Sequence, residues 1–396
     1  MFTLLLALAT VPLLIWVILT FFRGGYWQIA RFDVDLQIAN TPAEWPRVLA
    51  VVPARNEAQT IERAVESLLR QDYPGEYQVL VVDDHSEDRT AAIAHSAAQF
   101  LKATDRLRIV PAKELPPGWT GKLWAIEQGV EASAQFDPDY YWFTDADITH
   151  SSDTLGRLIA RAETDHLDLT SLMVLLQAKS FPERLLIPPF LYFFLKLYPP
   201  FWIASPTAKT AGAAGGCALL KRTALERIGG VAAIKSEVID DCALARAVKG
   251  SGGSIWMGLT RNSISLRTYS SFSEIRDLIA RTAFTQLRYS TLLLVGTLAG
   301  MLLTYLAPFL FSFSSQAIVW RLGLTAWALC TITYLPTLRF YGLSPLWAPT
   351  LPFAAAFYSY STCISASRYW LGSGGQWKGR SQAPSKQIAE GGRSKG

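Results

Sequence analysis

The sequence predicts an α/β fold with a mostly parallel sheet, flanked by transmembrane helices, and three features of its 396 residues support this. Short apolar runs of strand length alternate with segments of helical periodicity. Polar and acidic loops follow those runs, as they do at the carboxyl ends of parallel strands. Long stretches with little or no charge lie toward both ends of the chain and are typical of membrane helices.

The first of these stretches contains no charged residue from 2 to 22. It is as long as a spanning helix and has no basic residue before it, so we expect an uncleaved anchor at 1–23 rather than a cleaved signal peptide. Arg23 and Arg31 follow it. Because basic residues favour the cytoplasmic side, we expect a multi-pass protein of the inner (plasma) membrane whose middle domain faces the cytoplasm.

A polar connector at 24–47 leads to the domain predicted for 48–290, which opens with alternating strands and helices. Each expected strand is a short, continuous apolar run, which is typical of burial on both faces of a sheet. The expected strands lie at 48–52, 79–82 and 107–110 and from Tyr140 onward, and the helices lie at 59–70 and before about 101 and 132.

The second half of this domain is less regular. We expect strands at 167–176 and 255–257 and a helix at 236–249. The apolar segment 185–203 contains two Pro-Pro pairs and one lysine, so we interpret it as lying in the membrane interface, with a buried hairpin-like core element as the alternative. A basic amphipathic helix at 276–288 is expected to lie at lipid headgroups.

From 291 to 367 the only charged residues are Arg321 and Arg339. This region is long enough for about three spans, at 292–313, 317–338 and 346–367. A disordered basic tail is expected at 368–396. Three spans after the anchor put this tail outside, whereas its basic residues favour the inside, and the sequence leaves that conflict open.

Charge and cysteine usage exclude several classes of protein. The net charge is +5, but no groove of interleaved aromatic and basic residues is evident, so we expect attraction to anionic lipid headgroups and no nucleic-acid partner. The four cysteines form no CxxC pair, which argues against a zinc site or a disulfide framework. A GxxxxGK[ST] loop is absent, which argues against a nucleotidyl- or phosphotransferase.

Asp145 and Asp147 directly follow the aromatic strand that begins at Tyr140. Paired carboxylates at a strand's end are suited to Mg²⁺ or Mn²⁺, which bridge carboxylates to a diphosphate. This favours an enzyme that uses a nucleotide-activated substrate. The spacing alone is weak, because it recurs at Asp33/Asp35 and Asp137/Asp139.

Five motifs follow one another between about residues 48 and 290. They are Pro53-Ala54-Arg55-Asn56-Glu57, Val82-Asp83-Asp84-His85-Ser86-Glu87-Asp88-Arg89-Thr90, Gly121-Lys122, Asp145-Ala146-Asp147 and Ile239-Asp240-Asp241-x-x-Leu244. In this order they resemble the family 2 glycosyltransferases. Membrane-bound members similar to ceramide glucosyltransferase share the flanking apolar segments, and the pattern resembles most the bacterial hopanoid-associated enzymes.

The resemblance implies a GT-A fold and a nucleotide-sugar donor, expected to be a UDP-sugar. Asp83 and Asp84 would accept hydrogen bonds from ribose and uracil. Capping of the next helix is the alternative, but with Asp88 also present it would explain one of these three acids and hardly all of them. Lys122 would meet charge near the donor, with a solvated surface lysine as the alternative, and Asp145 and Asp147 would hold the metal. The donor pocket as a whole is implied for Pro53, Arg55, Asn56, Glu57, Asp83, Asp84, Lys122, Asp145 and Arg288.

The catalytic base implied by the resemblance is the second member of an acidic pair, Asp241. The first member, Asp240, replaces the more usual Glu, so the choice between the two stays open, and helix-dipole stabilisation is the alternative role for both. Gln286-Leu287-Arg288-Tyr289 departs from the Gln-x-x-Arg-Trp motif of processive members. We therefore expect transfer of one sugar to a lipid hydroxyl, with a processive synthase or a catalytically silent nucleotide-binding scaffold as alternatives.

Overall fold

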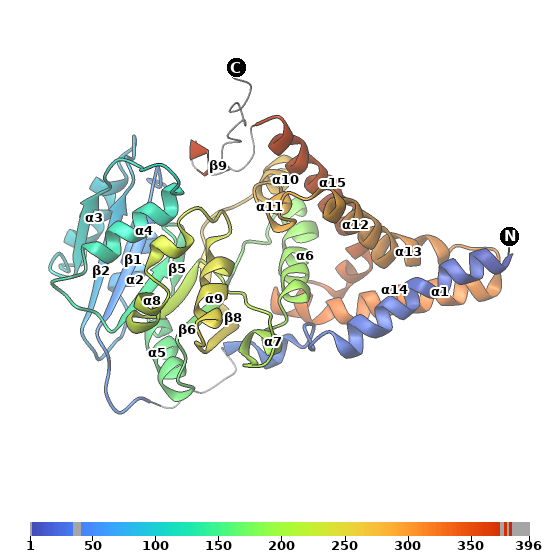
Figure 1. The fold of residues 1–396 in the computed structure, drawn as a ribbon, viewed down its shortest axis with the longest axis horizontal. Coiled ribbons are helices and arrows are strands. Elements are labelled where there is room, and N and C mark those ends of the chain that lie inside the picture. The colour runs from blue at the N-terminus through green and yellow to red at the C-terminus, as the bar shows by residue number, and fades with distance from the viewer. Residues whose placement is uncertain (1, 35–40, 373–375, 378–379, 382–396) are drawn as a thin grey trace, which may run out of the picture.

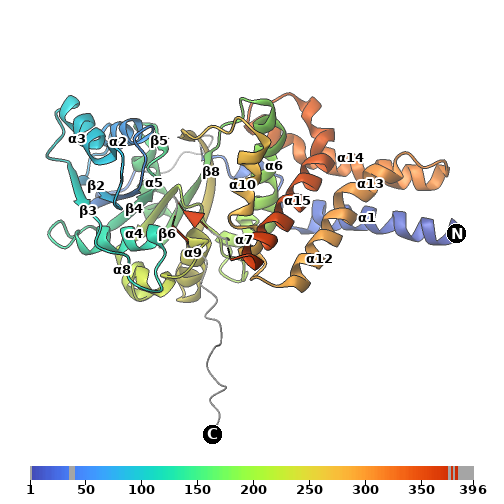
Figure 2. The same ribbon diagram turned by 90° about the horizontal axis from the view of Figure 1, so that it is seen from above.

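The computed structural model describes residues 2–34, 41–372, 376–377 and 380–381, and it shows an α/β domain joined to a helical part (Figure 1). Two long helices, α1 (Phe2–Phe22) and α14 (Ala317–Phe340), lie side by side and extend away from the sheet. Figure 2 shows three helices standing between the sheet and the ends of that pair: α6 (Phe181–Leu197), α10 (Phe272–Ala280) and α15 (Leu351–Trp370).

The α/β domain contains one eight-stranded sheet in the order β3-β2-β1-β4-β7-β6-β8-β5. Pairs β3-β2, β2-β1, β1-β4 and β6-β8 are parallel, whereas β7 runs antiparallel to both neighbours and β5 runs antiparallel to β8. The six predicted strands are confirmed; β5 and β7 were not predicted. The strands are β1 (Val48–Ala54), β2 (Tyr77–Asp83), β3 (Leu107–Pro111), β4 (Tyr140–Thr144), β5 (Ile148–His150), β6 (Leu169–Leu175), β7 (Cys217–Lys221) and β8 (Ile255–Ser265).

Helices cover both faces of this sheet because alternate strand residues point to opposite sides. In β1, Val48, Ala50 and Val52 pack toward α2, α3 and α5, whereas Leu49 and Val51 pack toward α4, α8 and α9. The second of these clusters continues into α6, α14 and α15, so the helical part shares a core with the domain. The covering helices are α2 (Ile61–Leu69), α3 (Thr90–Phe100), α4 (Gly121–Glu131), α5 (Thr154–Thr164), α8 (Arg222–Arg227) and α9 (Asp240–Gly250).

Two Pro-Pro pairs were expected to break the apolar segment 185–203, and only the second does. One 17-residue helix, α6, passes through Pro188 and Pro189, whereas α6 ends at Leu197 and α7 (Pro200–Ala204) begins at the second pair. Proline removes a backbone donor, but both rings are buried among neighbouring helices, and the Tyr358 hydroxyl of α15 donates to the Leu186 carbonyl at 2.9 Å. Packing thus holds a helix that local sequence preference disfavours.

The basic helix predicted at 276–288 is interrupted. Helix α10 ends at Ala280, and only a short helix, α11 (Ala283–Gln286), follows. Ser365 of α15 inserts here: its hydroxyl donates to the Ala280 carbonyl at 2.5 Å and accepts from the Phe284 N–H at 3.0 Å. Because those two groups would bond to each other in a continuous helix, the inserted side chain explains the break.

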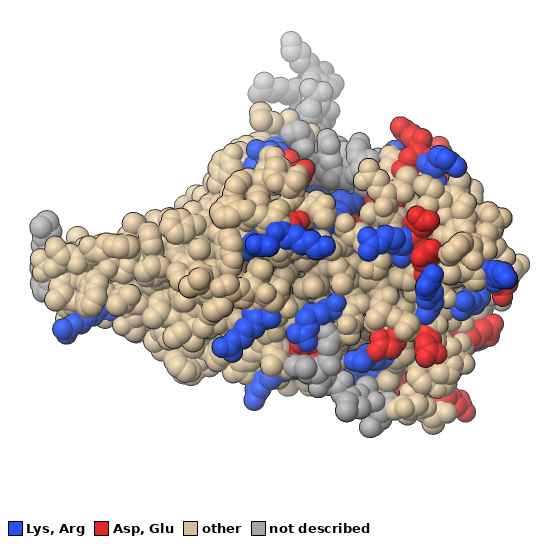
Figure 3. Space-filling model, turned by 180° about the vertical axis from the view of Figure 1, so that it is seen from behind, with Lys and Arg blue, Asp and Glu red and all other residues tan. Residues whose placement is uncertain are grey.

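Four helical segments of the described chain are long and apolar enough to cross a membrane: Thr3–Phe22, Phe181–Ala204, Thr291–Phe311 and Ala317–Phe340. The third comprises α12 (Thr291–Met301), a π-helical turn at Leu302–Leu306 and α13 (Ala307–Phe311). Helix α15 forms where a third C-terminal span was expected but is not among the four. On one face, Figure 3 shows lysine and arginine gathered between the domain and an extension almost free of charge.

The expected disordered tail at 368–396 falls largely outside the described residues. Within it, α15 ends at Trp370, and β9 (Gln376–Trp377) pairs antiparallel with β10 (Arg380–Ser381).

Glu183 joins α6 to the segment between β8 and α10. Its buried carboxylate accepts the N–H groups of Lys179, Ser180 and Tyr269 at 2.8, 2.8 and 2.6 Å. The Ser180 hydroxyl accepts from the Glu183 N–H and donates to the Tyr269 carbonyl, completing a capping box. The two segments therefore share one buried anion.

Glu183→Ala is expected to destabilise the protein by about 3 kcal/mol, because it leaves buried N–H groups without an acceptor. Glu62 of α2 is exposed and provides a control, so Glu62→Ala should change stability by less than about 0.5 kcal/mol. Denaturant unfolding in detergent measures both changes. Equal effects of the two substitutions would contradict a structural role for the Glu183 network.

Candidate active site

Three of the predicted motifs meet because β1, β2 and β4 are adjacent and parallel. The register pairs Ala54 with Asp83 and Val51 with Phe143, so the loops that follow these strands leave the same edge of the sheet. Parallel sheets place ligand sites at this edge. The loops contain the Pro53, Asp83 and Asp145 motifs.

Lys122, from the Gly121-Lys122 motif, links the Asp145 motif to the acidic pair on α9. Its ammonium Nζ lies 2.9 Å from Asp145 Oδ1 and 3.1 Å from Asp240 Oδ2. The first carboxylate follows β4 and the second begins α9, while Lys122 lies in the first turn of α4. Burial lowers the pKa of Lys122, but the two carboxylates outweigh this effect and raise it, so the ammonium stays charged.

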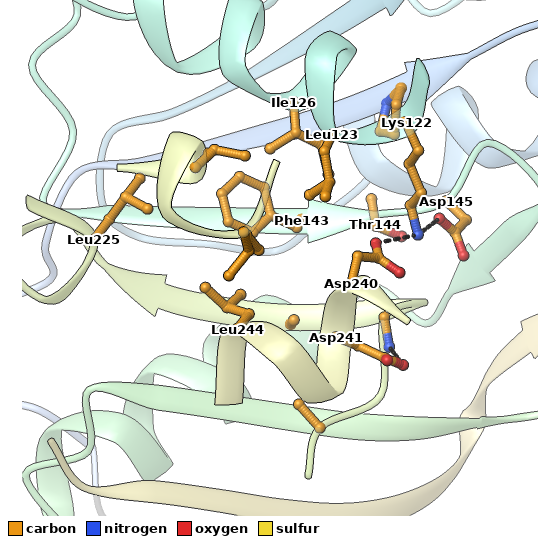
Figure 4. A pocket seen from close by; sticks show the side chains of 16 residues that line it. Lys122, Leu123, Ile126, Phe143, Thr144, Asp145, Leu225, Asp240, Asp241 and Leu244 are labelled. Carbon is orange, nitrogen blue, oxygen red and sulfur yellow. Dashed lines mark hydrogen bonds and ion pairs between the residues drawn. The ribbon is translucent and has the colours of Figure 1, made fainter. Parts of the chain in front are cut away.

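A cavity that is open to solvent adjoins this ion-pair cluster, and the empty space in it, open solvent included, is about 510 Å³. Its charged groups lie together, and apolar side chains of α4, β4, α8 and α9 form much of the remaining wall (Figure 4). The lining residues are Pro53, Lys122, Leu123, Ile126, Phe143, Thr144, Asp145, Ala213, Gly215, Ala218, Leu225, Val231, Ile234, Asp240, Asp241 and Leu244.

Asp241 differs from Asp240 in its partners. Its carboxylate accepts the N–H groups of Gly215 and Cys242 at 3.0 and 2.7 Å. Burial, together with the charge of Asp240, raises the pKa of Asp241 to about 6, although Lys122 and the backbone donors oppose the rise. A carboxylate with such a pKa can accept a proton near neutral pH, whereas Asp240 forms an ion pair with Lys122.

Gly215 lies against the two charged groups of the cavity. A Cβ atom at this position would be in ordinary van der Waals contact with the Asp241 carboxylate, at 3.4 Å, and with Lys122 Nζ, at 3.5 Å. A side chain larger than a methyl group would extend toward these charged groups.

Asp147 is paired with an arginine that the sequence analysis did not identify. Arg267 Nε donates to Asp147 Oδ2 at 2.6 Å, and Arg267 Nη2 donates to Glu57 Oε1 at 3.1 Å. Arg267 follows β8, and it reaches Asp147 because Ile148 pairs with Ser265 in the sheet. Arg267 belongs to none of the motifs. Its position two residues after the end of β8 was the only sign in the sequence that it could lie near the site.

The loops after β1 and β2 are joined by hydrogen bonds. Asn56 accepts the Glu87 N–H at 2.8 Å, and its own N–H donates to the Ser86 hydroxyl at 3.0 Å. Arg55 Nη1 donates to the Asp84 carbonyl at 2.6 Å. The Asp84 side chain is buried, and Asp83 is half-buried.

Neither Asp83 nor Asp84 caps α3. That helix begins at Thr90 after Arg89, without a side-chain cap, and Asp83 accepts the Ser86 N–H at 3.3 Å within the loop. The capping alternative is therefore wrong for both acids. Asp83 is the one of the pair with surface available to a ligand.

Arg288 is not brought to this cavity. It is exposed, has a φ of 52° and lies outside the lining residues. In the same segment, Gln286 donates to the Tyr198 hydroxyl at 2.6 Å, and Tyr289 stacks on Tyr369 of α15 with ring centres 4.3 Å apart. These contacts attach the segment to the helical part.

The Asp145-Ala146-Asp147 turn fits a divalent ion that is bound jointly with a ligand. Its two carboxylates supply hard oxygen donors, but among the described residues no group of three or more His, Cys, Asp or Glu side chains is arranged to hold an ion. Mg²⁺ and Mn²⁺ sites often use one or two carboxylates together with substrate phosphates and water. Such an ion would have to compete with Lys122 and Arg267 for the carboxylates.

A family model described as "Glycosyl transferase family 2" matches residues 49–229, which include nearly all of β1, the strands β2 to β7, Lys122 and the Asp145-Ala146-Asp147 turn. Residues 49–229 form a family 2 glycosyltransferase domain. The acidic pair on α9 lies beyond the matched residues, and the cavity brings it to them.

Curated relatives match parts of the chain. Glycosyltransferase AglE of Haloferax volcanii is 36% identical over 92 residues, covering 23% of this chain and 29% of that protein. The beta-monoglucosyldiacylglycerol synthase of Synechocystis sp. is 34% identical over 116 residues, covering 29% of this chain and 22% of that protein. The matched stretch thus spans less than a third of either relative.

Similarity in fold extends further along the chain. The mannosyltransferase PcManGT of Pyrobaculum calidifontis, solved with GDP-Man and Mn²⁺, has a TM-score of 0.53 at 19% identity, covering 92% of this chain and 99% of that chain. The glycosyltransferase domain accordingly has a GT-A fold, as predicted.

Proposed function

We propose that this protein is an inverting glycosyltransferase that moves one sugar from a nucleotide sugar, a UDP-sugar in the first instance, to a lipid hydroxyl. One observation carries the proposal: a single cavity contains an acid poised to accept a proton, Asp241, beside the ion pair of Asp145 and Lys122. These are the groups that glycosyl transfer requires, a base for the acceptor and charge control at the leaving diphosphate.

Asp241 acts as the base. Its carboxylate takes the proton of the acceptor hydroxyl as the acceptor oxygen forms a bond to the anomeric carbon. The bond from that carbon to the diphosphate oxygen breaks with its electrons remaining on the diphosphate, so attack from the opposite face inverts the configuration. The N–H groups of Gly215 and Cys242 orient the carboxylate for this proton transfer.

Lys122 and Asp240 form the electrostatic support of this step. Asp240 holds the ammonium beside Asp145 at the edge of the cavity, where negative charge develops on the leaving diphosphate. Arg55, Asn56, Glu57 and Asp83 shape the nucleotide pocket, and Pro53 lines the wall beside it. Asp84, being buried, supports the loop, and Arg288 is not assigned to the donor.

Asp145 and Asp147 would hold the divalent ion, Mg²⁺ or Mn²⁺, and this ion would neutralise charge on the departing diphosphate. The carboxylates suit it because each is a hard oxygen donor at the end of β4, next to the cavity or its edge.

A lipid acceptor is supported by the helical part. We assign residues 1–23 as an anchor, 48–290 as the cytoplasmic catalytic domain and 291–367 as membrane region, and α6 now joins the candidate spans. Large apolar side chains are exposed along α1, α12 and α14, which is costly in water and favourable in lipid. A matched relative is named as a glycolipid synthase. A hopanoid acceptor is the narrowest form of this proposal and rests on the order of motifs.

Membranes containing the protein, incubated with labelled nucleotide sugars and total lipid, are expected to yield a glycolipid with one added sugar and inverted anomeric configuration. Mass spectrometry identifies the product. A polymer on the lipid would instead support a processive synthase, and no transfer from any donor would support a nucleotide-binding scaffold.

Asp241→Asn is expected to lower kcat by about 1000-fold, because amide nitrogen and oxygen cannot take the acceptor proton. UDP affinity, measured by calorimetry, should stay within about threefold of the parent value. The matched control is Asp240→Asn, which disturbs Lys122 but leaves the base and should cost about tenfold. If the two losses are reversed, Asp240 is the base.

The acid limb of kcat/KM against pH is expected near pH 6, since activity requires deprotonated Asp241 and rises as pH passes its pKa. The charge of Asp240 contributes to that raised pKa, so Asp240→Asn should lower the pKa and move the limb to lower pH. Initial rates from about pH 4 to pH 8 measure the shift. A limb that stays in place, or moves up, contradicts the assignment.

A further inference from the structure

Arg267 connects three separate parts of the site. Its guanidinium contacts Asp147, which follows β4, and Glu57, which follows β1, while its own backbone follows β8. The side chains of Asp147 and Glu57 are only 13% and 12% exposed, so both carboxylates are largely removed from water. Carboxylates in such surroundings require a cation or several donors.

The backbone at Arg267 is as firmly placed as the side chain. The Leu266 N–H donates to the Asp147 carbonyl at 2.7 Å, and the Arg267 N–H donates to the Ser265 hydroxyl at 3.3 Å. Two residues later, Tyr269 is joined to Glu183 at the start of α6. The guanidinium therefore reaches Asp147 from a fixed point rather than from a free surface loop.

Asp147 carries one negative charge, so Arg267 and a divalent ion bound to it would compete for the same carboxylate. We infer that Arg267 is a positioning residue that holds Asp147 when no ion is present and competes with the divalent ion for that carboxylate. This inference rests on the proposed metal-dependent function and adds a residue to it.

Competition of this kind couples the ion to the donor. An ion alone must either displace the guanidinium from Asp147 or bind the other carboxylate oxygen beside it. The first loses an ion pair and the second places two cations close together, so each costs part of the binding free energy. A nucleotide diphosphate supplies oxygen ligands to the ion and a new anion for the displaced guanidinium. Ion and nucleotide should therefore bind more tightly together than separately, and Arg267 sets the size of that coupling.

The test is a titration of the purified full chain with Mn²⁺, with and without UDP, followed by the electron paramagnetic resonance signal of free Mn²⁺. Without UDP, Arg267→Met should bind Mn²⁺ about tenfold more tightly than the parent, the change expected from removing one partly buried ion pair. The ratio of Kd without UDP to Kd with UDP should fall correspondingly.

Arg261→Met is the matched control. Arg261 lies in β8, is 39% exposed like Arg267 and pairs with buried Asp33 at 2.9 Å. Its removal should leave both Kd values within about twofold, since Asp33 is not among the cavity's lining residues.

Arg267→Lys separates charge from shape. A lysine keeps the cation but cannot span Asp147 and Glu57 with a planar fork, so Mn²⁺ affinity should lie between the parent and Arg267→Met. It also decides the matter should the methionine variant fail to fold, with about threefold tighter binding expected. Weaker Mn²⁺ binding in either variant would mean that Arg267 merely shapes the turn, and unchanged binding would mean that it does not compete; both overturn the inference.

This outcome is independent of the acceptor. A parent protein that transfers no sugar would refute the proposed function, whereas the Mn²⁺ titration requires no lipid and no sugar.

Discussion

The site depends on one interaction, the contact of Lys122 with Asp145 and Asp240. Its three residues lie on α4, after β4 and on α9, so the ammonium fixes the distance between the sheet edge and the helix that carries Asp241. Carboxylates this close repel one another and resist burial unless a cation lies among them. Without Lys122, the carboxylates of Asp240 and Asp145 would repel each other at the edge of the cavity. A single cation thereby organises acids far apart in sequence.

Sheet order supplies the second constraint. Because β8 pairs with β5, the residue that follows β8 reaches Asp147, which immediately precedes β5. The antiparallel strand β7 brings Gly215 beside Asp241 in the same way. The β4–β7 and β5–β8 pairings each join residues more than 70 positions apart in the sequence. As a result, Asp147 contacts the Arg267 guanidinium, whereas Asp241 contacts the Gly215 N–H.

The strands that alternate with helices were predictable because their apolar runs are local, and so were the acids that follow them. Arg267 was not predictable, since its partners are set by strand order rather than by neighbouring residues. The sequence likewise did not separate Asp83 from Asp84, whose different burial depends on how the loops pack. Pro188 and Pro189 disfavour a helix locally, and only the surrounding helices overcome that preference. The end of α10 was not predictable either, because Ser365, whose hydroxyl bonds to the Ala280 carbonyl, lies 85 residues away in the sequence.

The segment between β8 and α10 connects the Asp145-Ala146-Asp147 turn to helix α6. Arg267 contacts Asp147 at one end of the segment, and Tyr269 contacts Glu183 at the start of α6. Only Thr268 separates these two contacts, so a shift of α6 large enough to break the Glu183 network would also move the guanidinium. Helix α6 is thus joined to the Asp145-Ala146-Asp147 turn by a short connection that is fixed at both ends. The position of α6 and the geometry of the turn are consequently linked, so a substitution that moves one should also move the other.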